Sequence, residues 1–170
     1  MKIGFLGTGE ISKAVILGLL KSKIKYSKIY ISRRNKKNST YLSSLNKKII
    51  VLNENQNIIN NSDWIFLSVT PDVGCKILKK LKFKKSQTII SFISTIKMRD
   101  LKKFIKVKAK IFRAIPLPPI SLMKGPIPIY PPNKKIRIFF DKIGDSIEIK
   151  NEDLSLNFWA ISSLMAPYYK

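Results

Sequence analysis

Two glycines between a strand-like run and a helix-like stretch restrict the possible folds of this chain more than any other feature. The segment "IGFLGTGEIS", residues 3–12, places Gly7 and Gly9 directly after an apolar run. It fits a G-x-G-x-x-G turn with Ser12 at the third position. Gly7 would permit a tight strand-to-helix turn, and Gly9 would let a pyrophosphate approach the backbone. We therefore expect a dinucleotide-binding turn; a helix-leading turn without a ligand is the alternative.

Short β-rich runs alternate with helix-like stretches along most of the chain. Strands are predicted at residues 2–6, 28–32, 48–52, 63–69, 87–93 and 109–115. Helices are predicted at residues 11–20, 40–45, 54–61, 71–81 and 97–105. This alternation favours βαβ units and a parallel sheet covered on both faces. With right-handed crossovers, it predicts an α/β fold with an open, doubly wound, mostly parallel sheet of the Rossmann-like kind.

The segment of residues 116–132 interrupts this alternation, because it holds most of the nine prolines. We expect an ordered loop there, with one short strand at best. A helix at 134–143 and a last strand at 146–150 are predicted to follow. A final helix would then begin with Asn151 or Asp153 as its N-cap.

The end of the second predicted strand bears on the identity of the dinucleotide. An NAD-binding domain normally has an Asp or Glu there, which accepts from the ribose 2′-OH. This chain has Ser32, Arg33, Arg34 and Asn35 instead. Two guanidinium groups and a hydroxyl suit a 2′-phosphate, so NADP(H) is the predicted cofactor. The alternative is that both arginines are ordinary surface cations.

The chain is strongly basic, with 33 Lys and Arg against 10 Asp and Glu and a net charge of +23. Lys, Ile and Asn are abundant together, and their codons are all A/T-rich, so genome composition can explain much of the excess. The lysines are also spread along the chain rather than concentrated among aromatics, as a nucleic-acid surface would require. We expect no specific nucleic-acid partner, although a basic nucleic-acid-binding protein stays the least favoured alternative.

The residue types and segments that the sequence lacks exclude several classes of function. No histidine is present, so a Ser-His-Asp or Cys-His mechanism is excluded within this chain. The single cysteine, Cys75, falls in a predicted helix and is expected to be a small buried residue, and no metal site is expected. No apolar run approaches the roughly 18 residues of a membrane span, and no signal sequence is visible. We expect a cytoplasmic protein without a membrane partner, which takes its chemistry from a cofactor.

Several segments in order resemble the pyrroline-5-carboxylate reductase family. The family opening "GFIGxGxM" is matched by "GFLGTGEI", and its "SDxxxLAVKP" strand by "SDWIFLSVTP" at residues 62–71. Its "ISxAAG" strand corresponds to residues 90–95, and its "RxMPNTP" segment to "RAIPLPP" at residues 113–119. Its "EDL…LSGSGPAY" helix corresponds to residues 152–169. The resemblance implies an oxidoreductase of proline and amino-acid biosynthesis that transfers hydride from NADP(H) to a cyclic imine.

The resemblance also implies the cofactor residues and the domain plan. Asn55 lies at the position of a family asparagine that contacts the cofactor. Together with the turn, the second strand end and the fourth strand end, the expected cofactor-binding residues are Gly7, Thr8, Gly9, Glu10, Ile11, Ser32, Arg33, Arg34, Asn55, Val69, Thr70 and Pro71. Residues 1–150 would form the dinucleotide-binding domain. Residues 151–170 would begin a helical dimerisation domain that is truncated here.

The chain departs from the family pattern near the expected substrate. Leu117 and Pro118 replace an asparagine and a threonine in the 116–119 loop, and "SSLMAP" replaces "SGSGPA". No residue has a specific catalytic signal, so no catalytic residue is assigned. Two functions stay open: an imine reductase, and a truncated or split reductase that binds NADP(H) without activity of its own. A homo-oligomer or a separate helical domain is the expected protein partner.

Overall fold

The computed structural model describes residues 1–154, 157–158 and 160. These residues form one eight-stranded sheet in the order β3-β2-β1-β4-β5-β6-β7-β8. Its strands are β1 (Lys2–Leu6), β2 (Lys28–Ser32), β3 (Ile49–Leu52), β4 (Trp64–Leu67), β5 (Thr88–Ser91), β6 (Lys110–Ala114), β7 (Pro126–Tyr130) and β8 (Asp145–Glu148). The helices are α1 (Glu10–Lys21), α2 (Lys36–Leu45), α3 (Asn55–Asn60), α4 (Pro71–Leu78), α5 (Met98–Ile105) and α6 (Lys134–Phe140), with a 3₁₀ turn, η1 (Pro118–Leu122).

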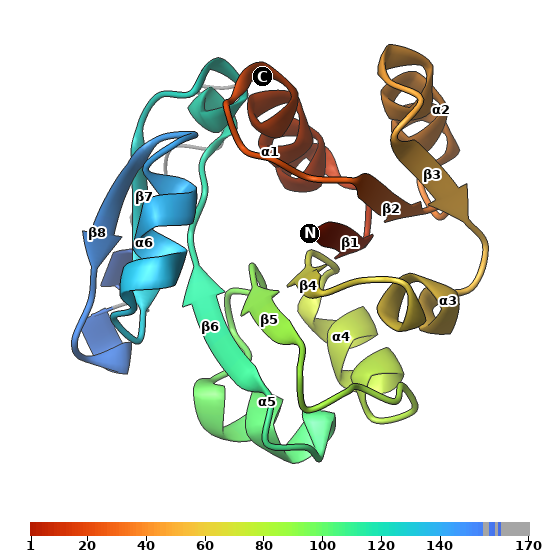
Figure 1. Cartoon of the computed structure of the whole chain (residues 1–170). Helices are drawn as coiled ribbons and strands as arrows, with labels where there is room; N and C mark the ends of the chain where they lie inside the picture. The colour runs from red at the N-terminus through yellow and green to blue at the C-terminus, as the bar shows by residue number, and fades with distance from the viewer. Residues whose placement is uncertain (155–156, 159, 161–170) are drawn as a thin grey trace.

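The sheet is parallel from β3 to β6, and the strand order reverses direction at β1 and β4. This is the doubly wound, Rossmann-like plan predicted from the sequence. Each strand from β1 to β5 is followed by a helix, so every crossover returns the chain to the same end of the sheet (Figure 1). The carboxyl ends of β1, β2 and β4 consequently lie side by side.

Helices cover both faces of the sheet and bury two hydrophobic cores (Figure 1). On one face, α1, α2, α6 and η1 pack over an aromatic group centred on Phe66, whose ring stacks on Phe5 with centroids 4.7 Å apart. On the other face, α3, α4 and α5 enclose Leu6, Ile65 and neighbouring side chains. All four residues of β4 are buried, as its apolar sequence predicts for a central parallel strand.

The proline-rich segment is more regular than predicted. It contains η1 and all of β7, which pairs antiparallel with β6. Positive φ angles at Met123 (57°) and Gly125 (94°) help reverse the chain between them. Ile120 is 1% exposed, and η1 lies so close to α1 that a Cβ on Gly18 would come 2.5 Å from the Ile120 carbonyl oxygen.

Two predicted helix boundaries were wrong, and so was the predicted burial of the cysteine. Helix α2 begins at Lys36 rather than near residue 40, because the Asn35 side chain accepts a hydrogen bond from the Asn38 N–H and caps it. Helix α4 ends at Leu78, three residues earlier than predicted. Cys75 lies in α4 but is partly exposed rather than buried. The final helix begins at 152, and the remainder of its predicted course lies outside the described residues.

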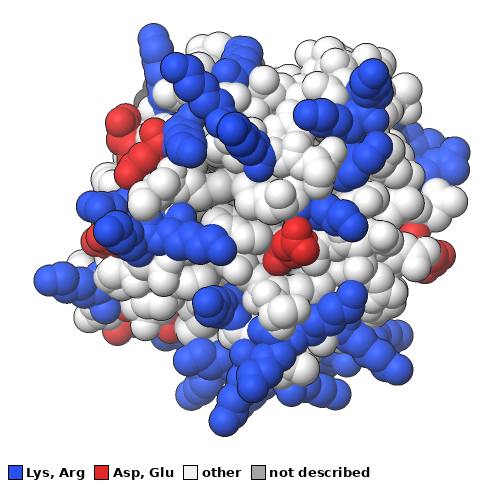
Figure 2. Space-filling view, in the orientation of Figure 1, with Lys and Arg blue, Asp and Glu red and all other residues white. Residues whose placement is uncertain are grey.

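Basic side chains cover much of the visible face, and none of the described helices is suited to spanning a membrane. Figure 2 shows blue Lys and Arg side chains over much of the visible face, with a denser group at its lower end, and few acidic ones. Within the described part of the chain, no helix combines the length and the apolar character required to cross a bilayer.

Candidate functional site

The turn after β1 has two glycines that serve different purposes. Gly7 has a φ of 100°, and a Cβ there would overlap the carbonyl oxygen of Ser68, the residue after β4. Only glycine therefore fits between the ends of β1 and β4. Gly9 has an ordinary φ of −70°, and nothing lies within 4 Å of the place where its Cβ would be. The surrounding protein therefore does not require glycine at position 9. The glycine instead leaves open space above the turn that a ligand could fill.

Hydrogen bonds to β2 hold this turn in place. The Gly7 N–H donates to Ser32 Oγ at 3.2 Å, and the Thr8 hydroxyl donates to the Ser32 carbonyl at 3.0 Å. Ser12 closes the turn from the helix side by donating its hydroxyl to the Gly7 carbonyl at 2.8 Å. The small hydroxyl residues at these positions thus fix the backbone whose N–H groups open α1.

Asn38 on α2 also holds the turn, although no sequence pattern singled it out. Its side-chain Nδ2, in a residue only 3% exposed, donates to the Thr8 carbonyl at 3.0 Å and to Glu10 Oε1 at 2.9 Å. The hydrogen bond from Asn38, aided by Lys13, lowers the pKa of the Glu10 carboxyl. The Glu10 carboxylate is therefore held by Asn38 and Lys13 while it stays largely exposed, and the backbone of Glu10 lies at the helix N-terminus.

Two adjoining cavities of about 430 and 580 Å³ form a groove across the carboxyl ends of β1, β2 and β4. Gly7, Arg34, Lys36 and Val69 line both cavities, so the groove is continuous. This is the switch point of the sheet, where doubly wound folds bind their ligands. The smaller cavity is bounded by cations on its β2 side and by an apolar wall of Val69, Val73 and Ile77 on its α4 side.

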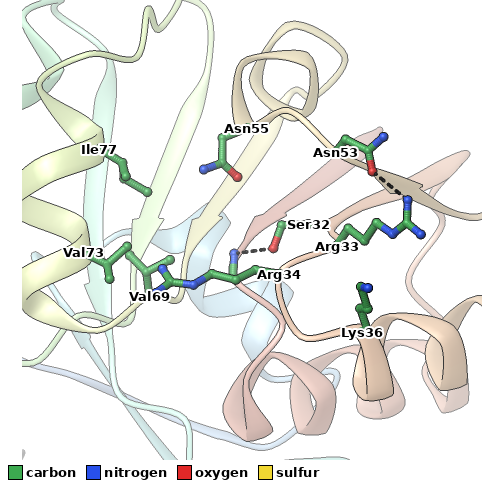
Figure 3. A pocket seen from close by; sticks show the side chains of 10 residues that line it. Ser32, Arg33, Arg34, Lys36, Asn53, Asn55, Val69, Val73 and Ile77 are labelled. Carbon is green, nitrogen blue, oxygen red and sulfur yellow. Dashed lines mark hydrogen bonds between the residues drawn. The ribbon is translucent and has the colours of Figure 1, made fainter.

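The three cations of the smaller cavity spread over its β2 side (Figure 3). Arg33 points away from the turn toward Asn53, and its Nη1 donates to Asn53 Oδ1 at 3.4 Å. Arg34 extends the other way, toward Val69, and Lys36 stands at the start of α2, below Arg33 in this view. Within the described residues neither Arg34 nor Lys36 has an ion-pair partner. Their charges are therefore available to an anionic ligand.

Most of the residues predicted to bind a cofactor lie around this groove. Those that line one or both of the two cavities are Gly7, Thr8, Gly9, Ser32, Arg33, Arg34, Asn55, Val69 and Thr70. Ile11 packs against the core, and Pro71 occupies the first turn of α4; like Glu10, they line neither cavity. The lining residues that were not among the predicted cofactor-binding residues are Asn35, Lys36, Asn53, Ser68, Val73 and Ile77. Lys36 follows the two arginines closely and was the one residue of this set that the same charge argument could have identified.

The arrangement fits a dinucleotide on structural grounds. The space above Gly9 would accept a pyrophosphate at the N-terminus of α1, where the helix dipole and N–H groups favour an anion. The cations beside β2 would face the ribose end, and the apolar wall from α4 suits a flat base. Among the described residues, no group of three or more Cys, Asp and Glu that could hold a metal is present.

Comparison with known proteins places the chain in a family. The family model described as "NADP oxidoreductase coenzyme F420-dependent" matches residues 2–95. Pyrroline-5-carboxylate reductase 3 of Danio rerio is 28% identical over 128 residues, which are 74% of this chain and 44% of the relative. The chain thus spans less than half the length of this relative.

Solved structures share the fold. The 1-pyrroline-5-carboxylate reductase of Streptococcus pyogenes superposes with a TM-score of 0.82 at 22% identity, covering 99% of this chain and 65% of that one. The pyrroline carboxylate reductase of Plasmodium falciparum, solved with NADP bound, superposes with a TM-score of 0.81 at 23% identity, covering 99% and 64%. From its sequence match and this shared architecture, the chain belongs to the NADP oxidoreductase coenzyme F420-dependent family, as a pyrroline-5-carboxylate reductase-like member.

Proposed function

We propose that this chain binds NADP(H) in the groove at the carboxyl ends of β1, β2 and β4, as the cofactor-binding part of an imine reductase. The pyrophosphate would lie over Gly9 at the start of α1. The adenosine half would enter the 430 Å³ cavity, with its base against Val73 and Ile77. The nicotinamide half would then extend over the ends of β4 and β5, where, when bound, it supplies hydride.

The observation that carries the choice of NADP(H) is the cationic side of that cavity. Arg33, Arg34 and Lys36 all line it, and none of the described residues lining it is a carboxylate that could accept from a ribose 2′-OH. A 2′-phosphate between these side chains would gain charge-assisted hydrogen bonds, each about twice as strong as a neutral one. A free 2′-OH would leave the same cations without an anionic partner.

Binding measurements with matched cofactors test this proposal. We expect calorimetry to show NADPH bound at least about tenfold tighter than NADH, equal to about 1.4 kcal/mol. Arg33→Ala and Arg34→Ala should each reduce the preference, while leaving NADH affinity nearly unchanged. Lys108→Ala removes an equal charge from a site just before β6, away from the groove, and is the control for the +23 net charge. Equal affinity for the two cofactors would refute the 2′-phosphate assignment.

We further propose a cyclic imine, of the pyrroline-5-carboxylate type, as the substrate. The support is the relative of that activity and the matched segments at residues 62–71, 90–95 and 113–119. A cytoplasmic location remains a prediction from the sequence. NADPH oxidation in the presence of pyrroline-5-carboxylate, followed by absorbance, tests the substrate directly.

A second candidate is a cofactor-binding polypeptide that needs a further helical chain or domain to complete the reaction. It is favoured by the 44% of the relative's length that the chain spans. Under this candidate the 170 residues bind NADPH but turn over pyrroline-5-carboxylate slowly or not at all. Robust turnover by these residues alone would refute it and leave the first candidate.

A further inference from the structure

The largest fully buried side chain of the described residues is an arginine. Arg113, in β6, is 1% exposed. Its Nη1 donates to Glu152 Oε1 at 2.8 Å, and its Nη2 donates to the Ser94 carbonyl at 2.6 Å. Burial lowers the pKa of Arg113, and the Glu152 carboxylate opposes that shift. A buried ion pair contributes little net stability compared with apolar residues of similar size. Stability alone therefore does not account for the Arg113–Glu152 pair.

Arg113 joins three segments that are distant in the sequence. Ser94 belongs to the loop between β5 and α5, Arg113 to β6, and Glu152 to the segment after β8. Glu152 Oε1 also accepts from the backbone N–H of Met98, at 2.6 Å, where α5 begins. One carboxylate oxygen therefore caps α5 and pairs with the buried guanidinium at the same time, which fixes its position closely.

Further polar contacts hold the described residues 151–154, which follow the buried Ile149. Lys97 Nζ lies 3.8 Å from Asp153 Oδ1 in an exposed pair. Asn151 Oδ1 accepts from the Asp153 N–H at 2.8 Å and so starts the helical turn. The apolar side chains of Leu154 and Phe158 remain 51% and 37% exposed. The position of residues 152–154 against the domain thus depends on Arg113 and Glu152.

We propose that Arg113 and Glu152 are positioning residues that fix the segment after β8 against the β5–α5 loop, at the edge of the sheet where the nicotinamide would lie. The inference deepens the proposed function and rests on it for the location of the nicotinamide. The pair would set the distance between the cofactor and residues 152–154. Neither side chain lines the groove that we assign to the adenosine and pyrophosphate.

Hydrogen exchange of the full chain tests the positioning role. Glu152→Ala should speed amide exchange in peptides covering residues 94–98 and 152–154 by about tenfold or more, because hydrogen bonds to a charged group are lost. Asp153→Asn is the matched control, since it removes only the exposed pair with Lys97, and it should change exchange by less than about threefold. Exchange in residues 28–36, beside the groove, should be unchanged in both variants.

A double variant separates positioning from stability. Arg113→Met with Glu152→Met replaces the ion pair with apolar side chains, and such replacements are often neutral or stabilising. We expect its melting temperature to match or exceed that of Glu152→Ala, while fast exchange at residues 94–98 persists. Normal exchange at those residues in either Glu152 variant would overturn the inference. NADPH affinity measured on the same samples keeps the two proposals apart. Failure of the wild-type chain to bind NADPH would refute the proposed function, whereas the exchange results test the positioning of residues 152–154 against the β5–α5 loop.

Discussion

Replacing Gly9 by alanine separates ligand binding from folding more cleanly than any other single change at the site. Gly9 has a φ of −70°, and no atom lies within 4 Å of the position that the new methyl group would take. Alanine is a poorer N-cap than glycine, but it also restricts the unfolded chain, and these effects should cancel to within about 1 kcal/mol. The free protein should therefore tolerate Gly9→Ala with little change in melting temperature.

The same methyl group would occupy the space that we assign to the pyrophosphate. Losing one charge-assisted hydrogen bond between an N–H and a phosphate oxygen costs about 1.5–3 kcal/mol. The dissociation constant should rise roughly tenfold to hundredfold. Because both cofactors share the pyrophosphate, NADPH and NADH should lose affinity by the same factor, unlike in Arg34→Ala. Calorimetry with both cofactors, paired with thermal unfolding, measures all of these quantities.

Gly7→Ala provides the contrast. Its positive φ of 100° and the overlap with the Ser68 carbonyl oxygen should destabilise the fold by at least about 1–3 kcal/mol. If Gly9→Ala bound both cofactors as tightly as the wild-type chain, the turn would not hold the pyrophosphate. If it unfolded as readily as Gly7→Ala, the assignment of distinct roles to the two glycines would be wrong.

Two further predictions concern the contacts that hold the turn from α2. Asn38→Asp places a carboxylate against the Thr8 carbonyl and Glu10 Oε1. It should lower the melting temperature and weaken the binding of NADPH and NADH by the same factor. A selective loss of NADPH binding would contradict a role of Asn38 in the turn that both cofactors share. The hydrogen bond from Asn38 lowers the pKa of the Glu10 carboxyl. The ionised carboxylate therefore stabilises the fold at pH values above the unfolded pKa, and this stabilisation is lost as the pH falls through the folded pKa. Glu10→Gln should flatten the acid side of a stability–pH curve, by less than about 1 kcal/mol because the carboxylate is largely exposed; a steeper acid loss would show that the sign is wrong.

The sequence predicted the parallel part of the sheet because the signals there are local. The apolar runs that became β1, β2 and β4 are each short and bounded by polar or turn-forming residues, and Gly7 and Gly9 mark the first turn. The 116–132 segment was predicted less well, since prolines suppress the local strand signal. Its order comes from tertiary contacts, such as the burial of Ile120 beside Gly18.

Site residues could be predicted from the sequence where their position at the end of a strand places them beside the groove. The ends of parallel strands meet at one edge, so Ser32, Arg33 and Val69 could be grouped from the sequence alone. Asn38 could not, because its contact with Thr8 depends on how α2 packs across the turn, 30 residues later in the chain. Arg113 was matched only as part of a family motif, and its burial beside Glu152 required the antiparallel return of β7 and the parallel pairing of β8.

The location of the bound cofactor is the most direct test of the central claim, that this groove binds NADP(H). Backbone amide chemical shifts of the labelled chain, recorded during titration with NADPH at physiological salt, report that location. We predict saturable changes that are largest at residues 7–11, 32–36 and 68–70. Changes concentrated on the exposed lysines of α5 and the loop that follows it, reproduced by inorganic pyrophosphate and abolished by added salt, would instead show non-specific anion binding by a chain of net charge +23 and would contradict the claim.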